Sequence, residues 1–179
     1  MTKMMQKTDK HGRNFRYYKQ RTQVTCGPAC CLMMWANVFE ADPIADEGGV
    51  IALSRKHPKA WNPVSGAEIS NLSRVMAEMG IPNEVKTITD PRQLRSAFHN
   101  RVHRKKPALA FAEWEVASKV VGHFVVVAYA DSARDEWTIL APSNGVQATT
   151  GIPAYYPYVN GSDDDPVLKF TGAVAFVTA

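Results

Sequence analysis

The 179-residue sequence has only three cysteines and no long hydrophobic run. Cys26, Cys30 and Cys31 lie within six positions of one another, so they have no distant partners for a disulfide framework. No second Cys/His pair stands at ligand spacing, which argues against a zinc site. No run approaches the roughly 18 apolar residues that a membrane helix needs. We therefore expect three thiols, one of them a candidate nucleophile, and no membrane span.

An excess of charge of either sign is missing from most of the chain. The formal net charge is +4, but the first 19 residues alone sum to +5, which leaves −1 for the other 160 residues. We expect residues 1–18 to form a flexible basic arm and residues 19–179 to form a single domain. The near-neutral body argues against nucleic acid as a partner. Because the arm lacks the apolar core of a secretory signal peptide, we expect a cytoplasmic protein, or one exported without a Sec signal.

Helical patterns precede strand patterns along the chain. Hydrophobic residues make up 45% of the sequence and charged residues 21%, which is typical of globular domains. Helices first and strands second predict an α+β fold, with a C-terminal antiparallel sheet packed on a helical half. The helix that begins at Cys26 is apolar nearly all round, which predicts a buried position. Further helices are predicted from the capping pattern at residues 65–68 and from Asp90 followed by Pro91, and strands over residues 107–111, 120–129, 137–140 and 173–177.

Cys26 stands at the start of the apolar helix, directly after a polar stretch. A helix N-terminus stabilises an anion through its dipole and its free N–H groups. We therefore expect the pKa of this thiol to fall, so that the reactive thiolate exists near pH 7. Cys30 and Cys31 lie inside the helix without that advantage, which favours inert core positions for both. Taken alone, Cys26 is better explained as a small buried hydrophobic residue.

His123 opens an apolar strand that reads Gly-His-Phe-Val-Val-Val-Ala-Tyr over residues 122–129. A histidine there can project from the rim of a sheet toward a helix end, the geometry that a thiolate–imidazolium pair needs. A single histidine of this kind is more often a rim residue without a catalytic role. Its combination with a cysteine at a helix N-terminus favours a catalytic pair.

Two segments of the sequence resemble one peptidase family. Gln20, five further residues and then Cys26-Gly-Pro-Ala-Cys-Cys-Leu-Met-Met resemble the nucleophile segment of bacteriocin-processing, double-glycine peptidases. Gly-His-Phe-Val-Val at residues 122–126 resembles the second block of that family. These bacterial proteins are papain-like cysteine peptidases, often fused to peptide-exporting ABC transporters. The resemblance covers roughly residues 20–145 and implies a papain-like fold with a buried nucleophile helix.

The resemblance also implies a role for each matching residue. Cys26 would attack the scissile carbonyl as a thiolate. The side-chain amide of Gln20, with the backbone N–H of Cys26, would form the oxyanion hole. His123 would take the thiol proton and later protonate the leaving amine. Gln23 is an amide nearer to the cysteine, but its spacing does not match the family.

The sequence departs from the family at the third catalytic position. Family members place an Asp before a Pro on the strand that follows the histidine strand, and here Ala141 precedes Pro142. Alanine cannot orient an imidazole. Asn144 is the best substitute, because papain-type enzymes often use an Asn amide in this role, although a plain Ser-Asn-Gly turn explains it as well. The site would therefore work as a Cys–His dyad, use Asn144, or only bind peptides.

These residues predict a cysteine peptidase that acts on a peptide or protein substrate and needs no cofactor. The first alternative is a glutamine deamidase or acyltransferase effector, because the same Cys–His site attacks amide carbonyls generally. The second alternative is a catalytically degenerate peptide-binding domain. The family's link to exporters makes a transporter or secretion partner a further expectation.

Overall fold

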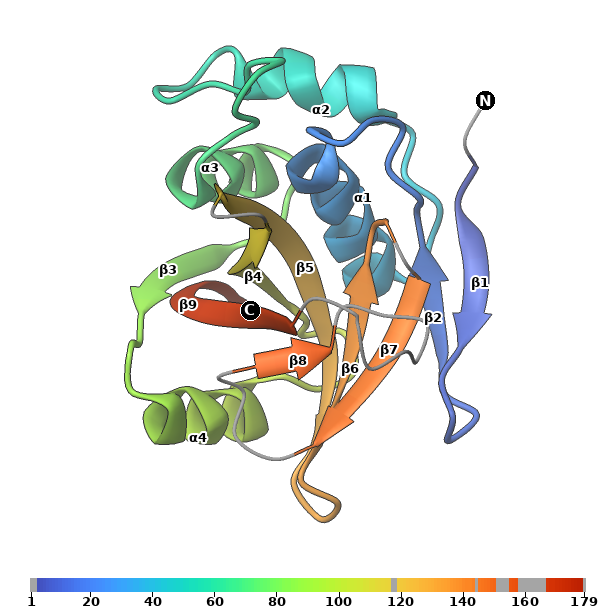
Figure 1. Ribbon diagram of the computed structural model, residues 1–179. Helices are drawn as coiled ribbons and strands as arrows, with labels where there is room; N and C mark the ends of the chain where they lie inside the picture. The colour runs from blue at the N-terminus through green and yellow to red at the C-terminus, as the bar shows by residue number, and fades with distance from the viewer. Residues whose placement is uncertain (1–2, 117–118, 144, 151–154, 158–166, 179) are drawn as a thin grey trace.

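The protein is built on a seven-stranded sheet with helices on both faces, beside a separate two-stranded ribbon (Figure 1). The computed structural model describes residues 3–116, 119–143, 145–150, 155–157 and 167–178. The strands of the large sheet follow the order β3-β9-β4-β5-β6-β7, with β8 beside β9, and every pair is antiparallel. This arrangement confirms the predicted α+β fold.

Most of the sheet follows the helices in the chain, as the sequence predicts. Only the ribbon β1–β2 precedes the first helix, and only β3 interrupts the helices. The helices are α1 (Cys26–Phe39), α2 (Glu47–Ser54), α3 (Ile69–Glu78) and α4 (Pro91–Arg101). The strands are β1 (Met5–Thr8), β2 (Asn14–Tyr17), β3 (Asn83–Thr87), β4 (Ala108–Val116), β5 (Lys119–Asp131), β6 (Glu136–Ala141), β7 (Gly145–Thr150), β8 (Tyr155–Pro157) and β9 (Val167–Val177).

Helix α1 is the buried helix that the sequence predicts. Residues 26–34 are all buried, because apolar side chains cover the helix nearly all round and it packs against β5, α2 and α3. Gly27 permits a close approach of α3, since a Cβ there would lie 2.9 Å from Cδ1 of Leu72. Helix α3 therefore packs directly on the turn of α1 that carries Cys26.

The start of α4 is predicted correctly and the start of α3 is not. The Asp90 side chain accepts hydrogen bonds from two backbone N–H groups of the first turn of α4, as an N-cap does. The prediction that residues 65–68 cap the helix is wrong, because α3 begins at Ile69 and no side chain caps it. Asn62 explains the difference: its side chain bonds the backbone N–H and the hydroxyl of Ser65, which holds that serine in a separate turn.

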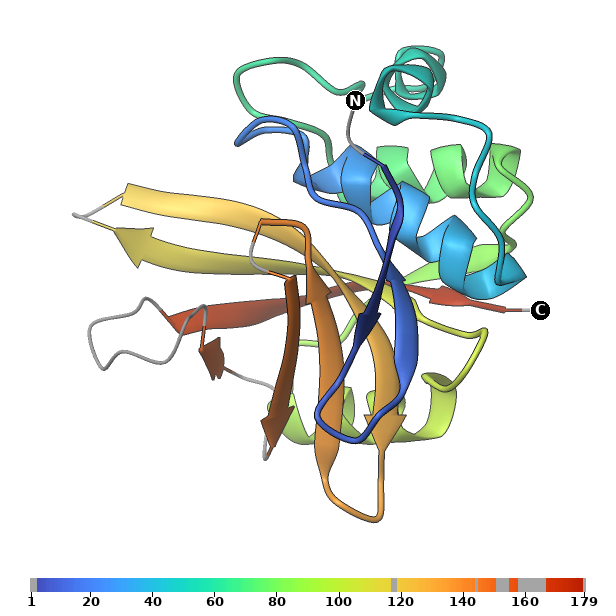
Figure 2. The same cartoon turned by 90° about the vertical axis from the view of Figure 1, so that its right-hand side faces the viewer.

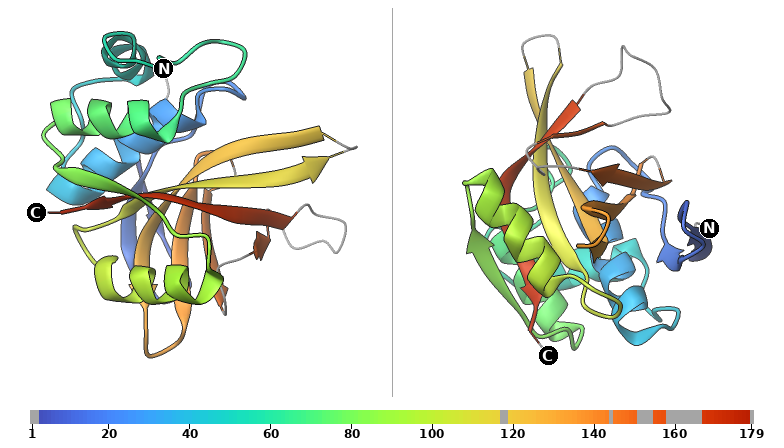
Figure 3. Two further views of the ribbon diagram at one scale, coloured as in Figure 1. Left: turned by 90° about the vertical axis from the view of Figure 1, so that its left-hand side faces the viewer. Right: turned by 90° about the horizontal axis from the view of Figure 1, so that it is seen from below.

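The two faces of the large sheet are covered by different helices (Figure 3, left). Helices α1 and α3 lie on one face and α4 lies on the other, while the hairpin β4–β5 projects beyond both layers (Figure 2). Phe124 and Val126 of β5 belong to the core under α1, whereas Val125 and Val127 belong to the core under α4. Side chains of a strand alternate between faces, so His123 shares the α4 face with Val125.

The N-terminal segment, for which the sequence suggested a flexible arm, forms a β-hairpin instead. β1 and β2 pair antiparallel, with Met5 opposite Tyr17. Phe15 and Tyr17 are buried in the core that also contains α1. The charge count over the first 19 residues takes no account of these aromatic side chains, which bury large apolar surfaces on folding. The domain limits of 19 and 179 stay a prediction.

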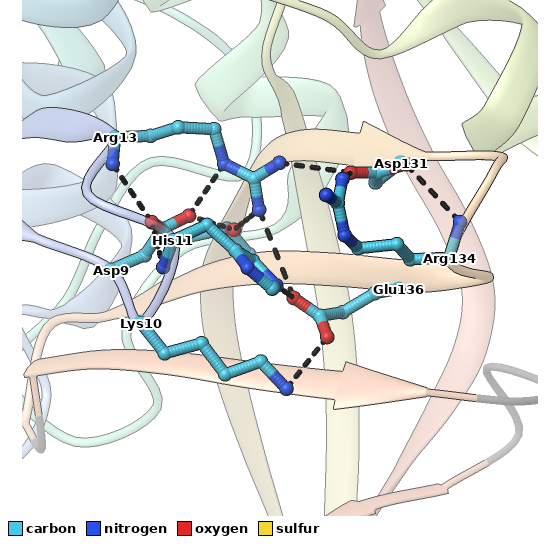
Figure 4. A network of polar contacts seen from close by, with 8 residues as sticks. Asp9, Lys10, His11, Arg13, Asp131, Arg134 and Glu136 are labelled. Atoms are coloured by element: carbon cyan, nitrogen blue, oxygen red, sulfur yellow. Dashed lines mark hydrogen bonds and ion pairs between the residues drawn. The ribbon is translucent and has the colours of Figure 1, made fainter.

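A network of ion pairs fastens the loop of this hairpin to β5 and β6 (Figure 4). The Arg13 guanidinium lies 2.7 Å from Asp9, 3.1 Å from Asp131 and 3.7 Å from Glu136. Burial alone would raise the pKa of Asp9 and of Glu136, but hydrogen bonds from neighbouring basic groups outweigh it and lower both. The basic charges of the segment therefore neutralise buried carboxylates of the same molecule.

Candidate active site

Cys26 lies in the first turn of α1, on the wall of a groove. Its side chain is nearly buried, and the backbone N–H of Phe124 donates a hydrogen bond to the sulfur. The backbone N–H groups of Gly27 and of Cys26 itself are also directed at the sulfur. The sulfur therefore lies next to the backbone of Phe124, the residue that follows His123.

Burial raises the pKa of the Cys26 thiol, and the backbone hydrogen bonds offset only part of that rise. The predicted fall in this pKa is therefore wrong in direction, because the thiol lies in an apolar wall that disfavours its charged form. Cys30 and Cys31 are fully buried, as expected of inert core residues. Burial raises the pKa of Cys31 to about 12 and that of Cys30 well above its usual value. Of the three thiols, Cys26 is the one that lines the groove.

His123 lies inside β5, four residues after the strand begins at Lys119, and not at the strand's start. Its side chain is 3% exposed. Burial lowers the pKa of His123 to about 4, so the imidazole is neutral at pH 7. The thiol and the imidazole are thus both uncharged at rest, whereas the sequence suggested a thiolate–imidazolium pair.

Ser143, a residue absent from our sequence prediction, lies against the His123 ring. Its Oγ is 3.5 Å from Nε2 of the imidazole. Ala141 is fully buried in the apolar core under α4 and offers the ring no polar group. Asn144, the predicted partner, lies outside the described residues.

Strand β5 carries a bulge on the C-terminal side of His123. The register shifts by one residue between Val127 and Tyr129, as a β-bulge does. Strand β6 ends at Ala141, which pairs with Gly145 of β7, so Ser143 lies in the turn that follows β6.

Gln20 lies close to the same segment and is not among the residues that line the groove beside Cys26. Its backbone N–H donates to the Pro142 carbonyl at 2.9 Å. Its side-chain Nε2 donates to the Thr22 carbonyl at 2.7 Å, and its buried Oε1 has no hydrogen-bond partner among the described residues. Gln23, whose spacing does not match the family, is the amide that lines the groove with Cys26.

A groove of about 620 Å³ opens beside Cys26. The hairpin β4–β5 contributes Phe111 and Val120 to its lining, and the loop before α3 contributes Val64. Val64 is 86% exposed and Val120 is 69% exposed, so apolar side chains face solvent along the groove. Gly122 also lines the groove, and a Cβ there would lie 2.5 Å from the Phe111 ring.

The polar groups at this end of the sheet are a thiol, an imidazole, a hydroxyl and amides. Together such groups can perform nucleophilic chemistry on a carbonyl carbon. In the part of the chain that the structure describes, no three His, Cys, Asp or Glu side chains are grouped to hold a metal ion. Over the same residues, no helix has the length and apolar character to cross a membrane.

No family model matches the sequence, and no curated protein matches it either. Solved structures do match the fold. The peptidase domain of Streptococcus ComA, a bifunctional ABC transporter of quorum sensing, is 14% identical with a TM-score of 0.58, over 90% of this chain and 96% of that one. A double-glycine motif protease from an AMS/PCAT transporter, solved with its leader peptide, is 17% identical with a TM-score of 0.55, over 97% and 96%. The peptidase domain of Streptococcus mutans ComA is 12% identical with a TM-score of 0.51, over 90% and 97%. The chain thus has the fold of double-glycine peptidase domains, the family that its two sequence blocks resemble.

Proposed function

We propose that the protein is a cysteine peptidase with Cys26 as its nucleophile. The position of the sulfur supports this most strongly. It lies at the N-terminal turn of a buried helix, on the wall of a groove, and accepts a hydrogen bond from the backbone N–H of the residue that follows His123. Backbone N–H groups directed at the sulfur stabilise negative charge there as it develops. The shared fold with double-glycine peptidase domains supports the same reaction.

The reaction begins with proton transfer from the Cys26 thiol to the His123 imidazole, because both groups start neutral. The sulfur bonds to the scissile carbonyl carbon, and the carbonyl oxygen becomes an oxyanion. The backbone N–H of Cys26 and one Nε2 hydrogen of Gln20 would stabilise it, while Thr22 holds the other hydrogen. The C–N bond then breaks as His123 protonates the leaving amine, and water hydrolyses the thioester.

The proposed substrate is an extended peptide with apolar side chains. Val64 and Val120 expose apolar surface along the groove, and burying that surface favours an apolar peptide over a charged one. The AMS/PCAT protease of the same fold binds a leader peptide. By analogy, a peptide exporter or a secretion system is the proposed partner that supplies the substrate.

A peptide-binding domain without catalysis is the second candidate. Ala141 offers no acid to the imidazole, and burial disfavours the charged forms of both Cys26 and His123. Each of these features weakens an ion pair at the site. Deamidation or acyl transfer on glutamine would use the same thiol and differs only in its product.

Mass spectrometry of peptide mixtures tests these candidates together. The purified chain is incubated with synthetic peptides that join an apolar segment to small residues, with Cys26→Ala in parallel. Cleavage that disappears in Cys26→Ala supports the peptidase. Conversion of glutamine to glutamate would identify a deamidase instead. Peptide binding without any product would identify the binding domain.

A further inference from the structure

The His123 imidazole has one ring nitrogen directed at a serine hydroxyl. The Ser143 Oγ lies 3.5 Å from Nε2, a distance at the long end for a hydrogen bond. Catalytic hydrogen bonds are often long before substrate binds and shorten in the reacting complex. Ser143 lies in the turn that follows β6, which ends at Ala141.

The short segment that carries Ser143 is held in place by its neighbours. The Tyr17 hydroxyl lies 3.1 Å from the carbonyl oxygens of both Ala141 and Pro142. The Gln20 backbone N–H donates to the Pro142 carbonyl as well. Two elements from the N-terminal part of the chain therefore fix the residue next to Ser143. A group that must orient another benefits from such support, because small displacements weaken its hydrogen bond.

We propose that Ser143 is the positioning residue for His123, in the place that an acid occupies in double-glycine peptidases. This inference rests on the proposed peptidase function. The Ser143 hydroxyl accepts the Nε2–H of the imidazole and so favours the tautomer in which Nδ1 is unprotonated. Nδ1 is then the ring nitrogen that takes the thiol proton.

Proton balance in this arrangement is simple. The proton leaves the Cys26 sulfur for Nδ1, the sulfur bonds to the carbonyl carbon, and the same proton later passes from Nδ1 to the leaving amine. The Ser143 hydroxyl stays neutral and keeps its own proton throughout. Because a hydroxyl adds no negative charge beside the imidazolium, the imidazole is readily deprotonated again. The resting pair of thiol and neutral imidazole, which burial favours, is therefore compatible with turnover.

The test uses Ser143→Ala, Ser143→Thr and Ser132→Ala, a control at the exposed turn that joins β5 to β6. Side-chain ¹⁵N spectra of histidine-labelled protein report the tautomer of His123, whose signals are assigned with His123→Gln. We expect the Nε2–H tautomer in the unsubstituted protein and a mixture in Ser143→Ala. We also expect Ser143→Ala to lower kcat on the order of ten-fold with little change in KM. We expect Ser143→Thr to keep most of the Nε2–H tautomer and most of kcat. Ser132→Ala should change neither the tautomer nor kcat.

Failure of this inference and failure of the peptidase proposal look different. If Ser143→Ala keeps the tautomer and the kcat of the unsubstituted protein, Ser143 has no positioning role, while cleavage by Cys26 stands. If the unsubstituted protein shows the Nδ1–H tautomer, the inference is wrong as well. If no peptide is cleaved at all, the peptidase proposal fails, and the spectra alone decide whether Ser143 orients the ring.

Discussion

The thiol half and the imidazole half of the proposed site are built in opposite ways. Cys26 belongs to one continuous buried helix, and its sulfur meets a single strand of the sheet. His123 depends on segments that are distant in sequence: Ser143 faces its ring, and Tyr17 and Gln20 hold the residues before Ser143. The comparison teaches that a local sequence pattern can indicate the nucleophile Cys26. The orientation of His123, in contrast, depends on segments that only the folded sheet brings together.

The largest effect is expected from removing the thiol. Cys26→Ala should lower the rate of peptide cleavage at least ~10³-fold, about 4 kcal/mol, because no neighbouring group can replace the nucleophile. Cys30→Ala is the matched control, one turn deeper in α1 and outside the groove. It should keep full cleavage and lose about 1 kcal/mol of unfolding free energy in urea titrations. Peptide cleavage by the Cys26→Ala protein would show that Cys26 is not the nucleophile.

The next effect concerns the hairpin that supports the imidazole half. Asp9→Ala should lower the free energy of unfolding by about 3 kcal/mol, because it leaves the part-buried Arg13 with one carboxylate fewer. Asp42→Ala, which breaks an exposed pair with Arg16 on the same hairpin, should cost less than about 1 kcal/mol. Urea unfolding of both variants measures the difference, and equal losses would show that burial does not distinguish the two pairs.

The dependence of stability on acid pH should also reveal the contribution of Asp9. Burial raises the pKa of Asp9, but its hydrogen bonds with Arg13 and Thr138 outweigh this and lower it. A lowered folded pKa gives stability that is present above the unfolded pKa of about 3.9 and is lost as the pH falls below it. Stability of the unsubstituted protein should therefore fall more steeply below about pH 4 than stability of Asp9→Ala. Parallel pH curves for the two proteins would contradict this.

The two amides provide a third comparison. Gln20→Ala should lower kcat about 10²-fold, near 2.7 kcal/mol, if its Nε2 stabilises the oxyanion. Gln23→Ala should change kcat less than about three-fold and act mainly on KM, because that side chain lines the groove. Steady-state kinetics with one cleaved peptide separates the two. A reversed order would assign the oxyanion hole to Gln23.

The smallest effect is a shift in the titration of Cys26. Burial raises the pKa of this thiol above its usual value of 9.0, so its thiolate fraction is small at pH 7 and still grows above pH 9. Alkylation by iodoacetamide should follow that rise, and peptide mapping should show Cys26 labelled before the fully buried Cys30 and Cys31. A rate that levels off below about pH 8 would instead indicate an ion pair with His123.

Local patterns were enough for much of the fold. The helix that begins at Cys26 and the one capped by Asp90 are where the sequence predicts them, because apolar periodicity and capping act over a few residues. The hairpin β1–β2 was not predicted, since Arg13 and His11 of its loop pair with carboxylates on β5 and β6, more than 100 positions away. The start of α3 was misplaced because Asn62 draws Ser65 into a turn.

By itself, the sequence determined the α+β class, the buried helix that presents Cys26, and the resemblance to double-glycine peptidases. The tertiary structure alone decided the neighbour of His123 and the charge state of the pair. The turn after β6 brings the Ser143 hydroxyl to 3.5 Å from Nε2 of the His123 ring, and no local pattern in the sequence marks that contact. Burial raises the pKa of Cys26 and lowers that of His123, because both side chains lose water only when the helix and the sheet pack together.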